Sequence, residues 1–228
     1  MTRLLLASAS PARRATLASA GLDPLVVVST VDEDAVLAAA HERFGDLGPA
    51  DAVLVLAQAK AEDVARRLDD LDVPGWDDDE DVVVLGCDSM LELDGEVLGK
   101  PRDADDAAAR WRAMRARSGV LHTGHWLVDE RDPASGGTGA TLGATASTVV
   151  HFADLSDDEV AAYVATREPL AVAGAFTVDG LGGPFVERIE GDHHNVVGVS
   201  LPLLRHLLAD VGLTVPTLWR HGLRVPQE

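Results

Sequence analysis

The sequence predicts an α/β fold with a mixed central sheet and flanking helices. Short apolar stretches typical of strands alternate along the chain with stretches of helical spacing. One continuous apolar run, residues 82–88, is typical of a strand that is buried on both faces. The chain has 228 residues, of which 46% are hydrophobic and only 4% aromatic, so we expect a sizeable core of Val, Leu and Ala.

The first half of the chain begins with a strand and a well-marked helix. Leu4–Ala7 predicts a short buried strand. Ser10 fits the N-cap and Pro11 the first position of a helix over 11–20, which Gly21 closes. The other elements predicted here are a strand at 25–30, a helix at 51–71, an acidic loop at 72–81, the strand at 82–88, and a hairpin at 91–101 about an Asp-Gly turn.

The second half predicts three helices and further strands within the same domain. A Ser-x-x-Glu capping box, Ser156 and Glu159, opens one of the helices. We expect one domain over 1–215 and a loosely held tail over 216–228. The predicted elements are helices at 103–117, 156–165 and 201–211, a flexible loop at 130–144, a strand at 145–153, and a turn-rich, strand-like segment at 175–192.

Charge and composition exclude several classes of partner. The formal charge of −19 argues against nonspecific binding to nucleic acid or to anionic lipid. No apolar stretch approaches the length of about 20 residues that spans a bilayer, and the apolar run before Ser8 is too short for a signal peptide. Because Cys87 is the single cysteine, the chain has no internal disulfide. We interpret Cys87 as a small residue of the core. We therefore expect a cytoplasmic protein.

The first predicted helix starts in a way that suits an anion. Free backbone N–H groups at a helix N-terminus bind anions, and Ser8 and Ser10 add hydroxyl donors. Arg13 and Arg14 place positive charge in the first turn, where it opposes the helix dipole unless an anion compensates. The pattern favours a bound phosphate, while an ordinary capped helix with solvated arginines stays open as an alternative.

An acidic residue and two lysines mark a second candidate region. The buried strand ends at Asp88, and Lys100 follows the hairpin. Ligand sites in open α/β sheets lie beyond the carboxyl ends of strands, where an acid can hold a metal or activate water. A turn or helix-cap role for Asp88 is the alternative. Lys60 and Lys100 are the only lysines among 19 basic residues, which suggests that a compact charge is needed at both positions.

Short motifs lie along nearly the whole chain. They are Ser-x-Ser-Pro-x-Arg-Arg at 8–14, Val-Asp-Glu at 31–33, Ala-x-x-Lys-Ala at 57–61, Gly-x-Asp at 86–88, Leu-Asp-Gly-Glu at 93–96, Gly-Lys-Pro at 99–101, Gly-Leu-Gly-Gly at 180–183, and Asn-Val-Val-Gly-Val-Ser-Leu-Pro-Leu at 195–203. Each motif is weak alone, but their order along the chain is specific. In these motifs and their order the chain resembles the Maf proteins, a family of nucleoside triphosphate pyrophosphatases also described as septum formation inhibitors.

The resemblance implies a nucleotide diphosphatase, a hydrolase that cleaves a nucleoside triphosphate to the monophosphate and pyrophosphate. It implies an elongated, two-lobed domain of the Maf type and a divalent cation, Mg²⁺ or Mn²⁺. Asp88 is implied as proton acceptor for the attacking water or as metal ligand, with Glu33 as its partner acid at the metal. The implied phosphate contacts are Ser8, Arg13, Arg14, Lys60 and Lys100.

Base preference, dimerisation and biological role are less specified. The positions implied to choose the base hold Ala12, Ser89 and Asp179, which match neither of the better-known subgroups. A homodimer and the removal of modified nucleotides are implied by the resemblance alone. A nucleotide-binding regulator of cell division without turnover is the alternative function. His193 and His194 lack metal-ligand spacing, so we interpret them as part of a turn.

Overall fold

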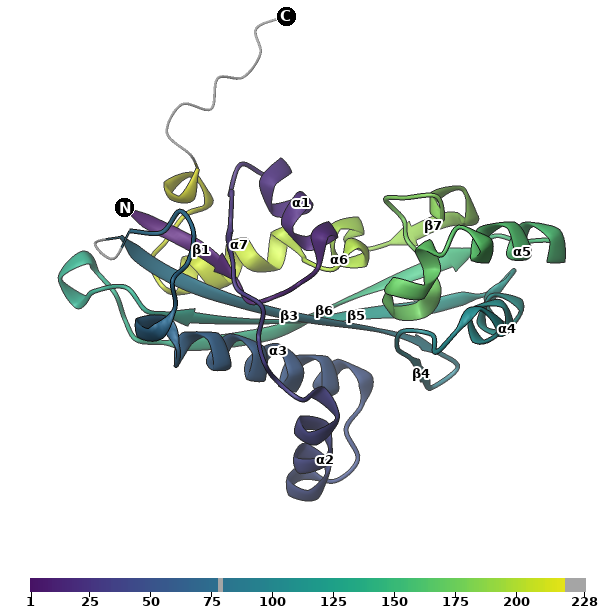
Figure 1. The fold of residues 1–228 in the computed structure, drawn as a ribbon, viewed down its shortest axis with the longest axis horizontal. Helices are drawn as coiled ribbons and strands as arrows, with labels where there is room; N and C mark the ends of the chain where they lie inside the picture. The colour runs from purple at the N-terminus through teal and green to yellow at the C-terminus, as the bar shows by residue number, and fades with distance from the viewer. Residues whose placement is uncertain (78–79, 220–228) are drawn as a thin grey trace, which may run out of the picture.

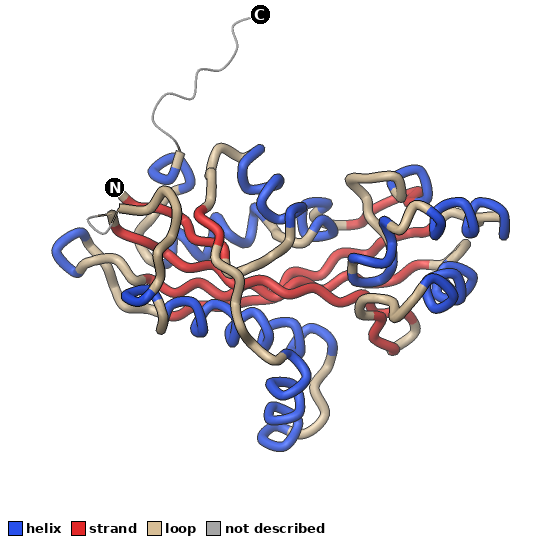
Figure 2. The backbone as a smooth tube through the Cα atoms, in the orientation of Figure 1, coloured by secondary structure: helices blue, strands red, loops and turns tan. Residues whose placement is uncertain are grey.

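Seven strands form one mixed sheet that runs along the length of the molecule (Figures 1 and 2). The structure is a computed structural model that describes residues 1–77 and 80–219. The strand order is β2-β1-β3-β5-β6-β7, with β4 beside β3; β1 is parallel to β2 and β3, and the other pairs are antiparallel. The strands are β1 Thr2–Leu6, β2 Leu25–Val26, β3 Asp81–Leu93, β4 Glu96–Leu98, β5 Ser118–Asp129, β6 Thr141–Phe152 and β7 Val186–Glu190.

Helices cover both faces of this sheet, as the sequence predicts. The long helix α3 lies along one face, and α1, α6 and α7 lie on the other (Figure 1). Helix α2 projects away from the sheet, while α4 and α5 lie at the far end. None of the helices among the described residues has the length and apolar character to cross a membrane. The helices are α1 Pro11–Ser19, α2 Glu33–Phe44, α3 Pro49–Ala65, α4 Ala104–Met114, α5 Asp157–Ala165, α6 His193–Val197 and α7 Leu201–Asp210.

Strand β3 is continuously apolar at its start because both of its faces are covered. Val82 and Val84 belong to the core cluster that contains Val64 of α3. Val83 and Leu85 belong to the opposite cluster, with Leu204 and other residues of α7. Successive side chains of a strand point to opposite faces, so each helix layer receives every second residue. Asp88, at an even position, therefore shares the α3 face with Val82 and Val84.

A second core at the far end of the sheet holds most of the aromatic side chains. Trp111 of α4 is fully buried, and its indole N–H donates to the carbonyl of Ala175 at 2.7 Å. Its ring makes edge contacts with Phe152, Tyr163 and Phe185, a favourable geometry for aromatic pairs. The expected core of Val, Leu and Ala is found in the two clusters that cover the start of β3. The expectation is wrong for this second core, which is rich in aromatic side chains. Strand β3 contributes residues to the cores at both ends of the sheet, so the two ends of the molecule are joined by one continuous strand.

The hairpin of β3 and β4 is confirmed, with Asp94 and Gly95 at positive φ in its turn. The capping box of α5 is also confirmed. Two expectations were wrong in part: β2 is shorter than predicted, and residues 141–144 belong to β6 instead of a flexible loop. Helix α6 lies where a turn was predicted, and α2 and β5 lie where no element was predicted.

The chain beyond residue 215 is partly described. Val215–Leu218 forms a short 3₁₀ helix, and Leu218 is buried against the core on the α7 face. The Trp219 indole N–H donates to the carbonyl of Ala20 at 3.1 Å. The described part of the predicted tail thus packs on the domain, and residues 220–228 lie outside the described residues.

Candidate active site

The candidate site lies at an open edge in the middle of β3. Strand β1 pairs with β3 as far as Leu85, and β4 begins to pair at Leu91. Among the described residues, the stretch 86–90 therefore has a strand partner on one side only, which is β5. Asp88 lies in this stretch, and the chain leaving β1 enters α1. The open edge gives a ligand access to a side chain that belongs to a rigid central strand.

Two carboxylates meet one ammonium group at this edge. The Lys60 Nζ atom lies 2.5 Å from Asp88 Oδ1 and 2.7 Å from Glu33 Oε1. Lys60 comes from α3, and Glu33 is the first residue of α2. Lys60 and Asp88 are buried, whereas the Glu33 side chain is 54% exposed. Three elements that are distant in the sequence thus form one charged cluster, open to solvent on the Glu33 side.

Arg13 joins the site from the opposite face of the sheet. Its guanidinium donates to Ser8 Oγ at 3.1 Å, to the carbonyl of Cys87 at 2.8 Å, to Ser89 Oγ at 2.9 Å and to the carbonyl of Gly198 at 2.7 Å. A guanidinium has five N–H donors, so most of them are used by the protein itself. Arg13 therefore ties β1, β3 and the segment after α6 together around Asp88.

The charge of Arg13 is not neutralised by a carboxylate. Its four acceptors are hydroxyl and carbonyl oxygens, and none of the ion pairs found among the described residues includes it. A buried cation without a counter-ion is costly, and an anionic ligand lowers that cost. This guanidinium is the strongest electrostatic signal for an anion site beside Asp88.

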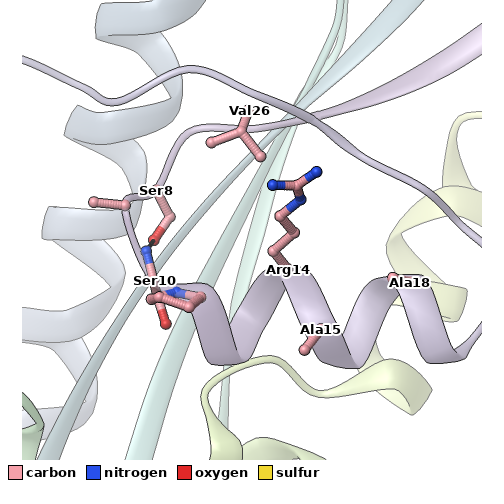
Figure 3. Close-up of a pocket in the computed structure, with 8 residues that line it drawn as sticks. Ser8, Ser10, Arg14, Ala15, Ala18 and Val26 are labelled. Atoms are coloured by element: carbon pink, nitrogen blue, oxygen red, sulfur yellow. Dashed lines mark hydrogen bonds between the residues drawn. The ribbon is translucent and has the colours of Figure 1, made fainter.

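Other predicted phosphate contacts lie outside this cluster. Arg14 extends from α1 toward Val26 of β2, where it lines a cavity of about 390 Å³ that Ser8 also lines (Figure 3). Lys100 is exposed, and within the described residues its ammonium makes no ion pair. Because Leu98 pairs with Leu91, the chain leaving β4 leads Lys100 toward the open edge of β3. The structure thus gathers Ser8, Arg13, Lys60, Asp88 and Glu33 but not Arg14.

Among the described residues, no hydrogen bond or ion pair joins the three predicted specificity positions to one another. Ser89 takes part in the site through Arg13, and its hydroxyl lies 2.9 Å from Thr123 Oγ1 of β5. Ala12 lies in the first turn of α1. Asp179 is exposed in the segment before η5, the 3₁₀ helix Gly183–Phe185. Only Ser89 is therefore connected by hydrogen bonds to the charged cluster.

Asp63 is a functional candidate that the sequence analysis missed. Its Oδ2 accepts from the Thr30 backbone N–H at 2.8 Å and from Arg67 at 2.9 Å. Burial raises the pKa of Asp63, but the Thr30 N–H and the Arg67 charge hold it below its ordinary value. Lys60 and Asp63, three residues apart on α3, thus hold Glu33 and Thr30, also three residues apart. The equal spacing of these two pairs of residues is the feature of the sequence that could have indicated a role for Asp63.

A buried histidine supports the segment that carries the Gly198 carbonyl. His125 Nε2 accepts from the Ser200 backbone N–H at 2.7 Å, and its Nδ1 lies 3.0 Å from the carbonyl of Thr123. The ring is therefore neutral, with its proton on Nδ1 donated to Thr123. Burial lowers the pKa of His125 to about 4.

We expect the free energy of unfolding to fall in acid because His125 is buried in its neutral form. The unfolded residue takes up a proton below about pH 6.5, whereas the folded residue resists protonation until about pH 4. The stabilisation is complete above the unfolded pKa and is lost as the pH falls through this window, a change of about 3 kcal/mol. Urea unfolding at several pH values measures it. Between pH 6.5 and 4, the dependence of the free energy of unfolding on pH should be weaker in His125→Gln than in the wild type. It should be unchanged in His206→Gln, a change at an exposed residue. An unchanged pH dependence in His125→Gln would contradict the assignment.

The acidic residues of the cluster also fit a divalent cation. The oxygens of Glu33 and Asp88 both approach the same Lys60 Nζ, so they face one small region. Mg²⁺ and Mn²⁺ prefer carboxylate oxygens, and such ions keep several ligand positions for water or phosphate. The donor set therefore matches a hard divalent ion better than a soft one.

Comparisons with known proteins identify the family of the chain. Residues 3–211 match the profile of the family described as Maf-like protein. A Salinispora tropica protein named nucleoside triphosphate pyrophosphatase is 56% identical over 96% of this chain and 88% of its own length. Proteins of the same name from Streptomyces coelicolor and Nocardia farcinica are 52% and 53% identical, over 95% and 97% of this chain and 94% and 98% of their own lengths.

Proposed function

The chain belongs to the family of Maf-like proteins, and from this premise we propose that it is a nucleoside triphosphate pyrophosphatase whose active site is the open edge of β3. The observation that carries the assignment of the site is the meeting of Lys60, Asp88 and Glu33 beside the uncompensated charge of Arg13. A bound triphosphate would supply the negatively charged partner that the Arg13 guanidinium lacks within the protein. We place the enzyme in the cytoplasm, with a nucleoside triphosphate as its substrate.

Asp88 is the proposed acceptor of the water proton. Lys60 holds its Oδ1, which leaves Oδ2 for the water that attacks the α-phosphorus. The new bond joins the water oxygen to the α-phosphorus, the bond from that phosphorus to the bridging oxygen breaks, and pyrophosphate leaves with the bonding electrons. Phosphoryl transfer depends mainly on positioning the reacting groups and on neutralising the charge of the phosphates. We propose that Arg13, Lys60 and Lys100 do both.

A divalent cation completes the proposal. Glu33 and Asp88 would hold Mg²⁺ or Mn²⁺, which neutralises phosphate charge and lowers the pKa of water. The structural support is the shared direction of the two carboxylates toward Lys60.

The test is a panel of standard and modified nucleoside triphosphates with Mg²⁺ or Mn²⁺, in which pyrophosphate and orthophosphate are measured separately. We expect pyrophosphate as the product, and the panel identifies the preferred base. Binding of nucleotides without release of pyrophosphate from any of them would overturn the enzyme and favour a regulator.

Asp63 is expected to act on catalysis through the position of Glu33. In Asp63→Ala the Thr30 backbone loses its acceptor, so the segment leading into α2 becomes free to move. We expect kcat to fall about tenfold and the cation concentration for half-maximal rate to rise, because a small misplacement of a site residue costs about that much or more. The matched control is Asp70→Ala, a change at an exposed acid in the short 3₁₀ helix Leu68–Asp70 that follows α3. An unchanged cation dependence in Asp63→Ala would contradict this role.

A further inference from the structure

A second cluster of metal-ligating side chains lies at the start of α6. Asp192, His193 and His194 follow one another in the chain, and each offers a ligand atom. These three atoms all lie within 4.8 Å of one another. The two imidazole rings lie side by side, with centroids 3.8 Å apart. The two histidines do not form the predicted turn: they are the first residues of α6, and Asp192 is its N-cap. Together the three residues gather three donors that the sequence spacing did not suggest.

The carboxylate of Asp192 has one oxygen in use and one without a partner. Oδ1 accepts from the His194 backbone N–H at 3.0 Å. Oδ2 is buried, and no hydrogen-bond donor reaches it from the described residues. A buried carboxylate oxygen without a donor destabilises the fold, so such an atom calls for an explanation. A bound cation would satisfy it.

The two histidines are free to act as ligands. The His193 side chain is exposed and makes no hydrogen bond within the described residues. His194 Nδ1 lies 3.3 Å from Asp192 Oδ1, and its other ring nitrogen is unused there. Binding a metal at either ring therefore breaks little that the fold depends on.

The backbone beneath the cluster is fixed in place. The carbonyl of Asp192 accepts from Thr148 Oγ1 of β6 at 3.1 Å. Asn195, which is fully buried, donates to the carbonyl of Leu121 at 3.2 Å and to Thr148 Oγ1 at 3.0 Å. The donors are therefore carried by a segment tied to two central strands, which reduces the entropy lost when they bind an ion.

We propose that Asp192, His193 and His194 bind a divalent transition metal of the Zn²⁺, Co²⁺ or Ni²⁺ class. Two imidazole nitrogens and one carboxylate oxygen suit these ions, whereas Mg²⁺ prefers oxygen ligands alone. Water fills the remaining positions. This site differs in chemistry from the all-carboxylate pair of Glu33 and Asp88, and it does not depend on the proposed function.

The test is a titration of the whole chain with CoCl₂, without nucleotide and in excess Mg²⁺, followed by visible absorption and calorimetry. Excess Mg²⁺ occupies oxygen-only sites, so the signal reports on imidazole ligands. The variants are Asp192→Asn, which can still cap the helix, His193→Asn, and the double variant His193→Asn with His194→Gln. His206→Gln changes an exposed histidine on α7 and is the matched control.

We expect saturable Co²⁺ binding by the wild type, weakened about tenfold or more in the double variant and in Asp192→Asn, and unchanged in His206→Gln. His193→Asn removes an exposed ring without hydrogen bonds, so it tests the site even where the double variant fails to fold. Absence of binding by the wild type, or equal affinity of the wild type and His193→Asn, would overturn the proposal. Pyrophosphate release plays no part in this readout, so its outcome is independent of the proposed activity.

Discussion

Asp88→Asn is expected to lower kcat for pyrophosphate release by about 10³-fold, within the range that a general base contributes. The amide keeps the shape of the carboxylate and can still accept from Lys60, but it cannot take the proton of the attacking water. Lys60 keeps Glu33 as a partner at 2.7 Å, so the fold should survive the substitution. Initial rates over a range of triphosphate concentrations, with circular dichroism of both proteins, measure the effect.

The control for this variant removes a carboxylate elsewhere. Asp210 is exposed at the end of α7, and Asp210→Asn should leave the rate unchanged. A rate for Asp88→Asn within a few-fold of the wild type would remove Asp88 from its role in proton transfer.

Gly86→Ala is expected to destabilise the fold by about 3 kcal/mol or more, through overpacking against a backbone that cannot move aside. A Cβ at this position would lie 2.1 Å from the carbonyl oxygen of Ala57 and 2.8 Å from the Ala61 backbone nitrogen, both in α3. Relief requires α3 to move away from β3. Because Lys60 lies between these two residues, that shift would also separate its ammonium from Asp88, and activity should fall with stability.

Gly99→Ala is the matched control. Nothing lies within 4 Å of a Cβ at Gly99, and its φ is not positive, so the substitution should cost little. Urea unfolding and pyrophosphate release of the two variants test the argument together. Equal stability of Gly86→Ala and the wild type would show that α3 does not pack as closely as described.

The elements that sequence reasoning recovered are those with local signals. An Asp-Gly turn specifies a hairpin because both residues adopt positive φ, as Asp94 and Gly95 do. The cap of α1 by Ser10 and the capping box of α5 are likewise set by residues a few positions apart. These features need no information from the rest of the chain.

The elements that were missed lack such signals. Strand β5 carries buried polar residues where alternation would place apolar ones; His125 and Thr123 are satisfied by Ser200 and Asn195, which are distant in sequence. Helix α2 packs mainly against α3 and projects from the sheet, so it has no broad apolar face that a sequence pattern could reveal (Figure 1). Both depend on tertiary partners that the local pattern does not contain.

The candidate site shows the same division. Motif order pointed to Ser8, Arg13, Lys60 and Asp88, and the structure brings them together. Sequence alone did not indicate that the protein uses most of the Arg13 donors, nor that Arg14 points away toward Val26 (Figure 3). Those facts follow from the meeting of α1 with β3 and with the chain after α6.

The central claim is that water attacks the α-phosphorus of a triphosphate bound at the open edge of β3. Hydrolysis of the preferred triphosphate in ¹⁸O-labelled water, followed by mass spectrometry of both products, tests it most directly. We expect the label to enter the nucleoside monophosphate and the pyrophosphate to be unlabelled. Label in the pyrophosphate, or release of orthophosphate as the first product, would contradict it.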